Sequence, residues 1–134
     1  MRQDSIMLIY AELSANPAQQ ERLAFELIDA AARSGADGIK VQTYTPDTIT
    51  LNAKTAPFII QDQPLWKGQN LWDLYQKAYT PWEWHADLQR TAVAAGLQFF
   101  STPFDATAVD FLEALHVPMH KVASFELIDI PLLE

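Results

Sequence analysis

Residues 38–44 read Gly-Ile-Lys-Val-Gln-Thr-Tyr, and their apolar and β-branched side chains favour a β-strand. The run ends in a polar cluster and Pro46, as expected where a strand gives way to a loop. A helical pattern precedes it over residues 18–34, with Gly35 as the expected residue after the helix end. The apolar stripe of this helix consists of Leu23, Leu27, Ile28 and Ala31. A helix that leads into such a strand is typical of parallel α/β structure.

Three further segments have the composition of strands. Residues 6–11 are a continuous apolar run, as expected of a strand that is covered on both faces. Residues 97–101 follow a helix end at Gly96, and residues 119–124 follow Pro118. Together with residues 38–44, these segments predict four strands that alternate with helices, which is the pattern of a parallel sheet.

Two of the expected helices begin at recognisable residues. One begins with Thr80 as its N-cap, Pro81 in the first position and Glu83 closing a capping box, and it ends before Gly96. The other begins at Asp105, and its inner stripe is formed by Val109, Leu112 and Leu115.

The segment 45–79 is irregular and long for a loop between a strand and a helix, where a few residues are usual. It is rich in aromatic side chains, and a short helix is expected within it at residues 70–78. Because long loops are more often functional than not, we expect a lid or an interface segment. A last helix is expected to start near residues 130–131.

The overall composition limits the classes of protein to consider. The chain has 134 residues, 49% of them hydrophobic and 19% charged, which fits one globular domain. Its net charge of −8 argues against a nucleic-acid partner, because no basic stripe is present. No apolar run approaches the roughly 20 residues that cross a bilayer, and residues 6–11 are too short for a secretory signal. Without cysteine no disulfide or thiolate metal site is expected, and a cytoplasmic protein is the expectation.

Ligands of parallel α/β proteins bind at the carboxyl ends of the strands, so polar residues there are the candidates for a site. Lys40 and Lys121 stand out because each lies in an otherwise apolar strand, where an unpaired ammonium group would be costly. With nearby hydroxyls they could form a cradle for a phosphate and a carboxylate. Glu12 and Glu126 could pair with them, or could orient a sugar hydroxyl and a water. Internal salt bridges or edge lysines explain the same pattern about as well, so the residues alone leave both interpretations open.

The remaining residues of chemical interest favour structural roles. His85, His116 and His120 have no metal-ligand spacing. The aromatic residues Trp82, Trp84 and Phe111 are expected in packing between helices. No glycine-rich phosphate loop, nucleophile elbow or Walker pattern is present.

Several stretches, taken in order along the chain, match one known family. They are Ala-Glu-Leu-Ser-Ala-Asn (11–16), Ala-Asp-Gly-Ile-Lys-Val-Gln-Thr-Tyr-Thr-Pro-Asp-Thr-Ile-Thr (36–50), Trp-Asp-Leu-Tyr (72–75), Ala-Tyr-Thr-Pro-Trp-Glu-Trp-His (78–85), Ser-Thr-Pro-Phe-Asp (101–105) and Lys-Val-Ala-Ser-Phe-Glu (121–126). On these residues the chain resembles the sialic acid synthase family, and most closely its pseudaminic acid synthase branch.

The resemblance implies a carbon–carbon bond-forming transferase of nonulosonic acid biosynthesis. Its substrates would be phosphoenolpyruvate and an open-chain amino sugar, 2,4-diacetamido-2,4,6-trideoxy-altrose, and its products a nine-carbon acid and phosphate. By the same resemblance, the catalytic residues would be Glu12, Lys40, Lys121 and Glu126. The substrate-binding residues would be Asn16, Gln42, Thr102 and Ser124.

The resemblance also implies which part of the substrates most of these residues would contact. Phosphoenolpyruvate would be held by Lys40, Thr102, Lys121 and Ser124. Glu12 and Gln42 would lie near the sugar or a metal-bound water, and Glu126 near the sugar carbonyl and the attacking water. A divalent metal ion, Mn²⁺ or Mg²⁺, would polarise the sugar aldehyde.

The family fold is a (β/α)₈ TIM-type barrel of about 250 residues. Residues 1–134 are expected to be its N-terminal half, with four parallel βα units and an incomplete barrel. The second half-barrel and a C-terminal antifreeze-like domain would be absent. The metal-ligating histidines of the family belong to that absent half, so no metal ligand is assigned here. The sequence also has Pro17-Ala18 where the family usually has His-Asn after Asn16, which removes a polar contact from the sugar side.

Other interpretations remain open at this point. The chain could be a non-catalytic half-barrel that serves in binding or assembly, an N-acetylneuraminate synthase, or another phosphoenolpyruvate-dependent synthase of the same barrel type. Four unclosed strands would leave two sheet edges exposed, which favours a homo-oligomer or pairing with the missing half. We expect the isolated chain to be inactive as a synthase.

Overall fold

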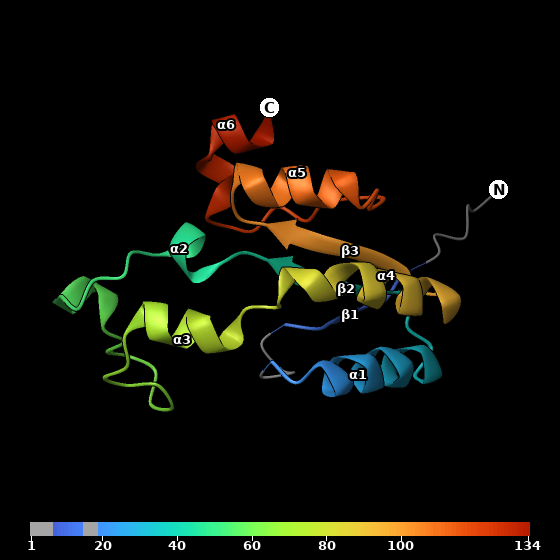
Figure 1. The fold of residues 1–134 in the computed structure, drawn as a ribbon, viewed down its shortest axis with the longest axis horizontal. Coiled ribbons are helices and arrows are strands. Elements are labelled where there is room, and N and C mark those ends of the chain that lie inside the picture. Colours follow the sequence, from blue (N-terminus) through green and yellow to red (C-terminus); the bar gives the residue numbers. More distant parts are fainter. Residues whose placement is uncertain (1–6, 15–18) are drawn as a thin grey trace.

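Three parallel strands form the centre of the protein, whose computed structural model describes residues 7–14 and 19–134. The strands are β1 (Tyr10–Glu12), β2 (Gly38–Thr43) and β3 (Gln98–Pro103), and they lie in the order β1-β2-β3. Figure 1 shows their carboxyl ends directed toward α2, α3 and α6. The expected α/β fold with parallel strands is confirmed, and the sheet is open rather than closed into a barrel.

The helices fall into two groups. The helices along the sheet are α1 (Glu21–Arg33), α4 (His85–Ala94, which follows the 3₁₀ turn Trp82–Trp84) and α5 (Ala106–Ala114). The helices near the carboxyl ends of the strands are α2 (Pro46–Ile49), α3 (Leu71–Ala78) and α6 (Ile130–Leu133), with 3₁₀ turns at Ala56–Phe58 and Glu126–Ile128. In the described part of the chain, no helix is long and apolar enough to cross a membrane.

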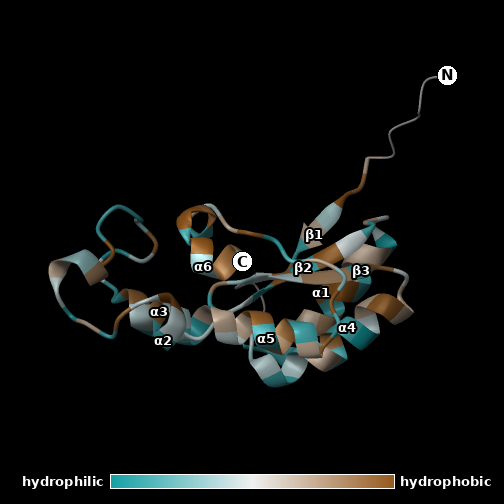
Figure 2. Ribbon diagram, turned by 90° about the horizontal axis from the view of Figure 1, so that it is seen from above, coloured by the Kyte–Doolittle hydropathy of each residue, from teal (hydrophilic) through white to brown (hydrophobic). Residues whose placement is uncertain are grey.

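The hydrophobic core lies on one face of the sheet. Side chains alternate between the two faces of a strand, so Ile39 and Val41 point toward the helices while Lys40 and Gln42 point away. The core cluster joins these strand residues to α1, α4 and α5; it contains Leu13, Ala24, Ile28, Ile39, Val41, Leu88, Ala92, Leu97, Phe99, Leu112 and Val117. Figure 2 shows helices on this side of the sheet and none over the strands on the opposite side. We call the uncovered side the open face.

The first predicted strand is only partly correct. The strand spans Tyr10–Glu12, whereas Met7, Leu8 and Ile9 lie outside it and are exposed. The apolar run therefore does not indicate a strand covered on both faces, because β1 is an edge strand and the face opposite the helices is open. Ile6 lies outside the described residues.

The predicted fourth strand, residues 119–124, is not formed as a strand. His120 makes one isolated parallel bridge to Ser101, and the Lys121 backbone N–H donates to the Ser101 carbonyl at 2.9 Å. In a parallel ladder the next hydrogen bond would run from the backbone N–H of residue 103 in β3 to the Lys121 carbonyl. Pro103 has no N–H, so the ladder cannot continue past Lys121.

The predicted helix starts had different outcomes. Asp105 caps α5 as predicted, since its carboxylate accepts the Thr107 N–H at 3.0 Å. The capping box predicted for Thr80 and Glu83 is wrong, because no side chain caps this helix and its first turn is a 3₁₀ turn that begins after Pro81. The short helix expected at residues 70–78 is confirmed as α3.

Gly38 allows the aromatic side chain of Tyr10 to cross β2 on the open face. Tyr10 and Phe100 stand on the strands either side of Gly38 and pack edge to face, with ring centroids 5.0 Å apart. The Tyr10 hydroxyl also donates to Gln98 Oε1 at 2.9 Å. A Cβ atom at Gly38 would lie 2.7 Å from the Gln98 carbonyl oxygen and 2.8 Å from the Tyr10 ring, both closer than van der Waals contact permits.

We therefore predict that Gly38→Ala destabilises the protein by about 1–3 kcal/mol, the usual cost of overpacking. The cost should shrink in a Tyr10→Ala background, because two of the three close atoms belong to the Tyr10 ring. Urea unfolding of the four proteins in this double-mutant cycle measures both quantities. An unchanged unfolding midpoint for Gly38→Ala would contradict the close approach.

Candidate functional site

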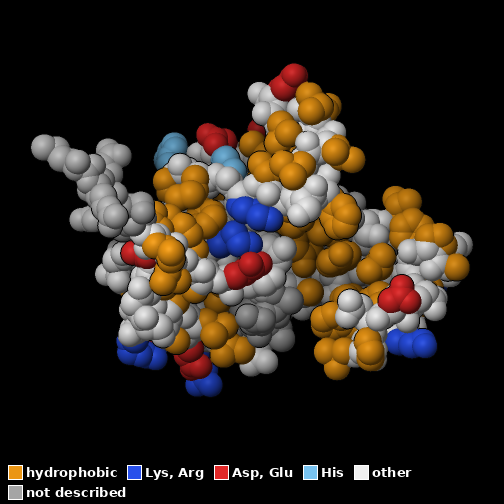
Figure 3. All heavy atoms as spheres, turned by 180° about the vertical axis from the view of Figure 1, so that it is seen from behind, with side chains coloured by type: hydrophobic (Ala, Val, Ile, Leu, Met, Phe, Trp, Pro, Cys, Tyr) orange, Lys and Arg blue, Asp and Glu red, His pale blue; other side chains and the backbone are white. Residues whose placement is uncertain are grey.

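An ion pair lies on the open face, where β1 and β2 run side by side. Glu12 and Lys40 are partners in the parallel register, and their Oε1 and Nζ atoms are 2.9 Å apart. The Lys40 side chain is only 13% exposed, whereas that of Glu12 is 51% exposed. Figure 3 shows basic and acidic side chains together near the centre of this face, with hydrophobic side chains around them. The carboxylate partner that the sequence left open for Lys40 is thus Glu12.

A second row of polar side chains lies closer to the carboxyl ends of the strands. Gln42 of β2 and Thr102 of β3 are partners in the parallel register. Lys121 comes directly after His120, which forms an isolated bridge with Ser101 of β3. The Ser14 hydroxyl donates to Gln42 Oε1, and the Gln42 amide N–H₂ donates to no group among the residues that the structure describes. Thr102 is 1% exposed, and its hydroxyl is buried with no hydrogen-bond partner among the described residues. A buried hydroxyl without a partner costs about 1–3 kcal/mol, which a ligand atom could offset.

The remaining predicted site residues lie beyond the strands. Lys121 and Ser124 are exposed, and Ser124 is in the turn that leads into the 3₁₀ turn Glu126–Ile128. Glu126 is half-buried, and its Oε2 atom is buried without a hydrogen-bond partner within the described ranges. Asn16, like Pro17-Ala18, lies outside the described residues.

Glu126 lines two cavities. One, of about 270 Å³, is lined by Lys121, Glu126, Pro103 and residues of α6. The other, of about 410 Å³, is lined by Gln42, Glu126 and a set of apolar residues: Tyr44, Ile49, Tyr75, Phe104 and Phe125. Glu126 therefore borders both the space beside Lys121 and the space beside Gln42. We call the second cavity the aromatic pocket.

Sequence reasoning did not assign the rings of the aromatic pocket to a site. Tyr44 contacts Tyr75 and Phe104 edge to face, with ring centroids 5.5 Å apart in both pairs. Burial raises the pKa of the Tyr44 hydroxyl well above its usual value, and the neighbouring Tyr75 raises it further. This hydroxyl thus stays neutral at physiological pH. Tyr44 and Phe104 each follow a strand end directly, which is the one signal in the sequence that could have identified them.

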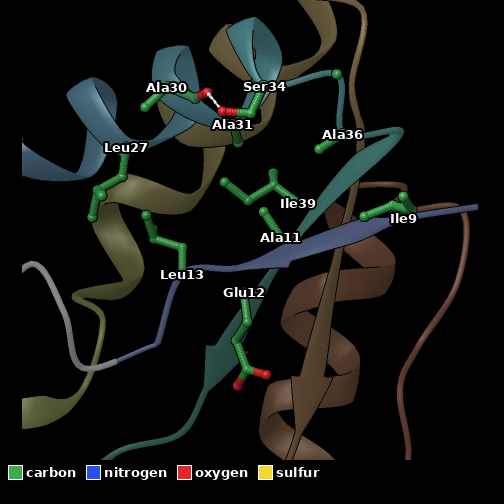
Figure 4. Close-up of a pocket in the computed structure, with 11 residues that line it drawn as sticks. Ile9, Ala11, Glu12, Leu13, Leu27, Ala30, Ala31, Ser34, Ala36 and Ile39 are labelled. Atoms are coloured by element: carbon green, nitrogen blue, oxygen red, sulfur yellow. Dashed lines mark hydrogen bonds between the residues drawn. The ribbon is translucent and has the colours of Figure 1, made fainter.

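A third cavity, of about 350 Å³, lies on the helix side of β1 and is lined mainly by apolar residues of β1 and α1. Figure 4 shows Leu13, Leu27 and Ile39 directed into it, while the Glu12 carboxylate points away from it. This cavity therefore belongs to the edge of the hydrophobic core and takes no part in the polar site.

The carboxyl ends of β2 and β3 are joined from the helix side by a buried polar chain. His85 Nε2 is 2.9 Å from Thr43 Oγ1, which is 2.6 Å from Ser101 Oγ. His85 Nδ1 lies 3.2 Å from the Pro81 carbonyl, which can only accept, so Nδ1 carries the proton and Nε2 accepts from Thr43. Thr43 and Ser101 adjoin Gln42 and Thr102 in their strands, so this chain fixes the backbone beneath the second polar row. The structural role expected for His85 is confirmed.

The described residues do not form a metal site. Within residues 7–14 and 19–134, no three His, Cys, Asp or Glu side chains gather closely enough to hold a metal ion. His120 pairs with Glu113, whose Oε1 lies 2.7 Å from its Nε2, on the helix side of the sheet.

The comparisons with known proteins agree with the resemblance drawn from the sequence motifs. The model of the NeuB family matches residues 27–134, which is most of the chain. The chain belongs to the NeuB family. It is 53% identical over 126 residues to the pseudaminic acid synthase of Helicobacter pylori, covering 94% of this chain and 37% of that protein. It is 46% identical over 123 residues to the pseudaminic acid synthase of Campylobacter jejuni, covering 92% and 36%.

A solved structure has a similar fold. The N-acetylneuraminic acid synthetase of Leptospira borgpetersenii, solved in complex with citrate, superposes with a TM-score of 0.76 and 24% identity over 99% of this chain and 44% of that one. The fold of this chain thus matches part of the fold of that longer protein. The chain spans little more than a third of the length of the two relatives above.

We predict that the His85 chain makes stability depend on pH between about 6.5 and 4. Burial lowers the pKa of His85 to about 4 from its ordinary 6.5, so the unfolded chain binds the proton more readily than the folded one. The contribution of neutral His85 is therefore complete above pH 6.5 and is lost as the pH falls toward 4, on the order of 3 kcal/mol.

Urea unfolding at several pH values, for the wild type and for His85→Gln, isolates this contribution, since the carboxylates titrate in both proteins. The wild type should lose more stability than the variant between pH 6.5 and 4. Equal losses would show that His85 is not held neutral by burial.

Proposed function

We propose that this chain supplies part of a pseudaminic acid synthase, an enzyme that condenses phosphoenolpyruvate with 2,4-diacetamido-2,4,6-trideoxy-altrose. In the reaction, the enol carbon of phosphoenolpyruvate forms a bond to the aldehyde carbon of the open-chain sugar. Water adds to the former enol C–O carbon, and inorganic phosphate leaves. The specific sugar is proposed because the two relatives above, both named pseudaminic acid synthase, are 53% and 46% identical to this chain.

The observation that supports anion binding most directly is Lys40. A lysine whose side chain is only 13% exposed, in the middle of a central strand, must be compensated by negative charge. Glu12 supplies one carboxylate and remains half-exposed, so the charge of Lys40 is available to a second anion on the open face. Lys121 emerges on the same face beside Thr102, with no acidic partner among the described residues. The two ammonium groups would offset the charge of the phosphate and carboxylate of phosphoenolpyruvate.

We assign the residues roles that follow their positions. Lys40, Thr102 and Lys121, with Ser124 in the turn beyond them, would bind phosphoenolpyruvate. Gln42 and Glu126, which line the same cavity, would face the sugar. Glu126 Oε2, which is buried without a partner from the described residues, would accept a proton or a hydrogen bond from the attacking water or the sugar hydroxyl. Glu12 would hold Lys40 in place. Asn16, which lies outside the described residues, would complete the sugar side on the strength of the family resemblance alone.

The proposal includes two requirements that the described residues do not meet alone. The divalent metal ion, Mn²⁺ or Mg²⁺, would have to be held mainly by residues outside the described ranges, and no step above is assigned to it. The residues beyond this chain would close the rest of the (β/α)₈ barrel, of which these 134 residues would form the first βα units. The exposed edge strand β1 would then pair with that remainder or with a second copy.

The test is a chimaera in which this chain replaces the matching 126 residues of the Helicobacter pylori relative. We predict phosphate release from phosphoenolpyruvate with the diacetamido sugar and Mn²⁺ for the chimaera, and none for this chain alone. Lys121→Gln in the chimaera should lower kcat/KM for phosphoenolpyruvate about 10- to 100-fold, because a hydrogen bond to a charged group contributes about 1.5–3 kcal/mol. Lys67→Gln, at an exposed lysine that lines neither the cavity beside Lys121 nor the aromatic pocket, should change this kcat/KM less than twofold.

Three results would contradict the proposal. They are a folded chimaera that releases no phosphate, equal effects of the two lysine substitutions, and activity with N-acetylmannosamine in preference to the diacetamido sugar. Phosphate release by the isolated chain, dependent on Lys121, would contradict its proposed inactivity.

A further inference from the structure

The aromatic pocket has a composition that a phosphate or a bare sugar ring does not require. Four aromatic rings line it from four different segments: Tyr44 after β2, Tyr75 from α3, Phe104 after β3 and the exposed Phe125 before the 3₁₀ turn Glu126–Ile128. Ile49 of α2 adds an aliphatic wall. Its volume of about 410 Å³ is within the usual range for pockets that bind small molecules.

The pocket is built rather than incidental. Tyr44 is 3% exposed, and its carbonyl accepts a hydrogen bond from Trp82 Nε1 at 3.1 Å. Helix α3, which carries Tyr75, is capped by Asn70, whose side chain also donates to the Ala53 carbonyl at 2.6 Å. Trp72 Nε1 donates to Asp47 Oδ1 at 2.8 Å and so ties α3 to α2. The long segment 45–79 thus serves to hold Ile49 and Tyr75 against Tyr44.

The polar groups of the pocket lie on the side that faces the anion-binding residues. Gln42 is the register partner of Thr102, and Glu126 also borders the cavity that contains Lys121. Gln42 presents an amide donor, and Glu126 presents a buried oxygen atom that has no hydrogen-bond partner in the described part of the chain. A ligand that enters from the open face would therefore meet polar groups first and aromatic rings further in.

We propose that the aromatic pocket binds the acetamido group on carbon 4 of the amino sugar and so determines substrate specificity. This assignment rests on the proposed function. The aldehyde carbon must lie beside phosphoenolpyruvate, so the carbon-2 substituent stays near the polar rim, whereas carbon 4 lies further along the chain. An acetamido group matches the pocket because it has an apolar methyl for the rings and an amide for Gln42 and Glu126. A hydroxyl in its place would leave the rings without a partner.

The test uses the chimaera described above and two sugars that differ only at carbon 4: the 2,4-diacetamido-2,4,6-trideoxy sugar and its analogue with a 4-hydroxyl group. Tyr75→Ala should lower kcat/KM for the diacetamido sugar about 10- to 200-fold, mainly through KM, because it removes apolar contact in a binding pocket. It should change kcat/KM for the 4-hydroxyl analogue less than twofold. Tyr75→Phe keeps the ring and should behave as the unsubstituted chimaera with both sugars.

Tyr79→Ala is the matched control, because Tyr79 is a half-buried tyrosine at the end of the same helix and does not line the pocket. It should leave the ratio of the two kcat/KM values unchanged. An equal loss for both sugars in Tyr75→Ala, or no loss for either, would overturn the pocket assignment while leaving the proposed function intact. A chimaera inactive with every amino sugar would overturn both.

Discussion

The two-residue period of the central strand β2 separates the hydrophobic core from the polar face. Ile39, Val41 and Thr43 point to the helices, and Lys40 and Gln42 point to the face that no helix covers. Parallel sheets are normally buried on both faces, so a charged side chain in such a strand requires compensation. The Glu12–Lys40 ion pair provides it within the sheet. The positions of Glu12 beside Lys40 and of Thr102 beside Gln42 follow from the register between this strand and its neighbours.

The site has two parts with different physical character. Near the strands, ammonium, hydroxyl and amide groups come from residues in adjacent register positions, and their spacing is set by the sheet. Further out, the aromatic pocket is set by contacts between segments that are distant in sequence, such as Tyr44 with Tyr75. The buried chain from His85 through Thr43 to Ser101 lies beneath both parts and fixes the strand ends from the helix side. Polar recognition thus depends on backbone register, whereas apolar recognition depends on the packing of the segment 45–79.

Features that depend on neighbouring residues in the sequence could be predicted, whereas features that depend on contacts with distant segments could not. The helix α1, the strand β2 and the Asp105 cap follow from patterns within a few residues. The prediction of a fourth strand was wrong because Pro103 of β3 lacks the N–H that would continue the hydrogen bonds to residues 119–124. Both lysines were identified from their strands, but the choice of Glu12 as the partner of Lys40 required the register. Tyr75 was placed by the sequence in the motif 72–75 and in the helix expected at residues 70–78, but nothing local shows that it contacts Tyr44.

The central claim is that the open face binds phosphoenolpyruvate through Lys40, Thr102 and Lys121. A crystal structure of the chimaera with phosphoenolpyruvate tests it most directly. The account predicts ligand oxygens within about 3.5 Å of Lys40 Nζ, Lys121 Nζ and Thr102 Oγ1, so that the buried Thr102 hydroxyl gains the partner it lacks. Phosphoenolpyruvate bound elsewhere, with the Lys40 ammonium still paired only to Glu12 and the Thr102 hydroxyl still without a partner, would contradict it.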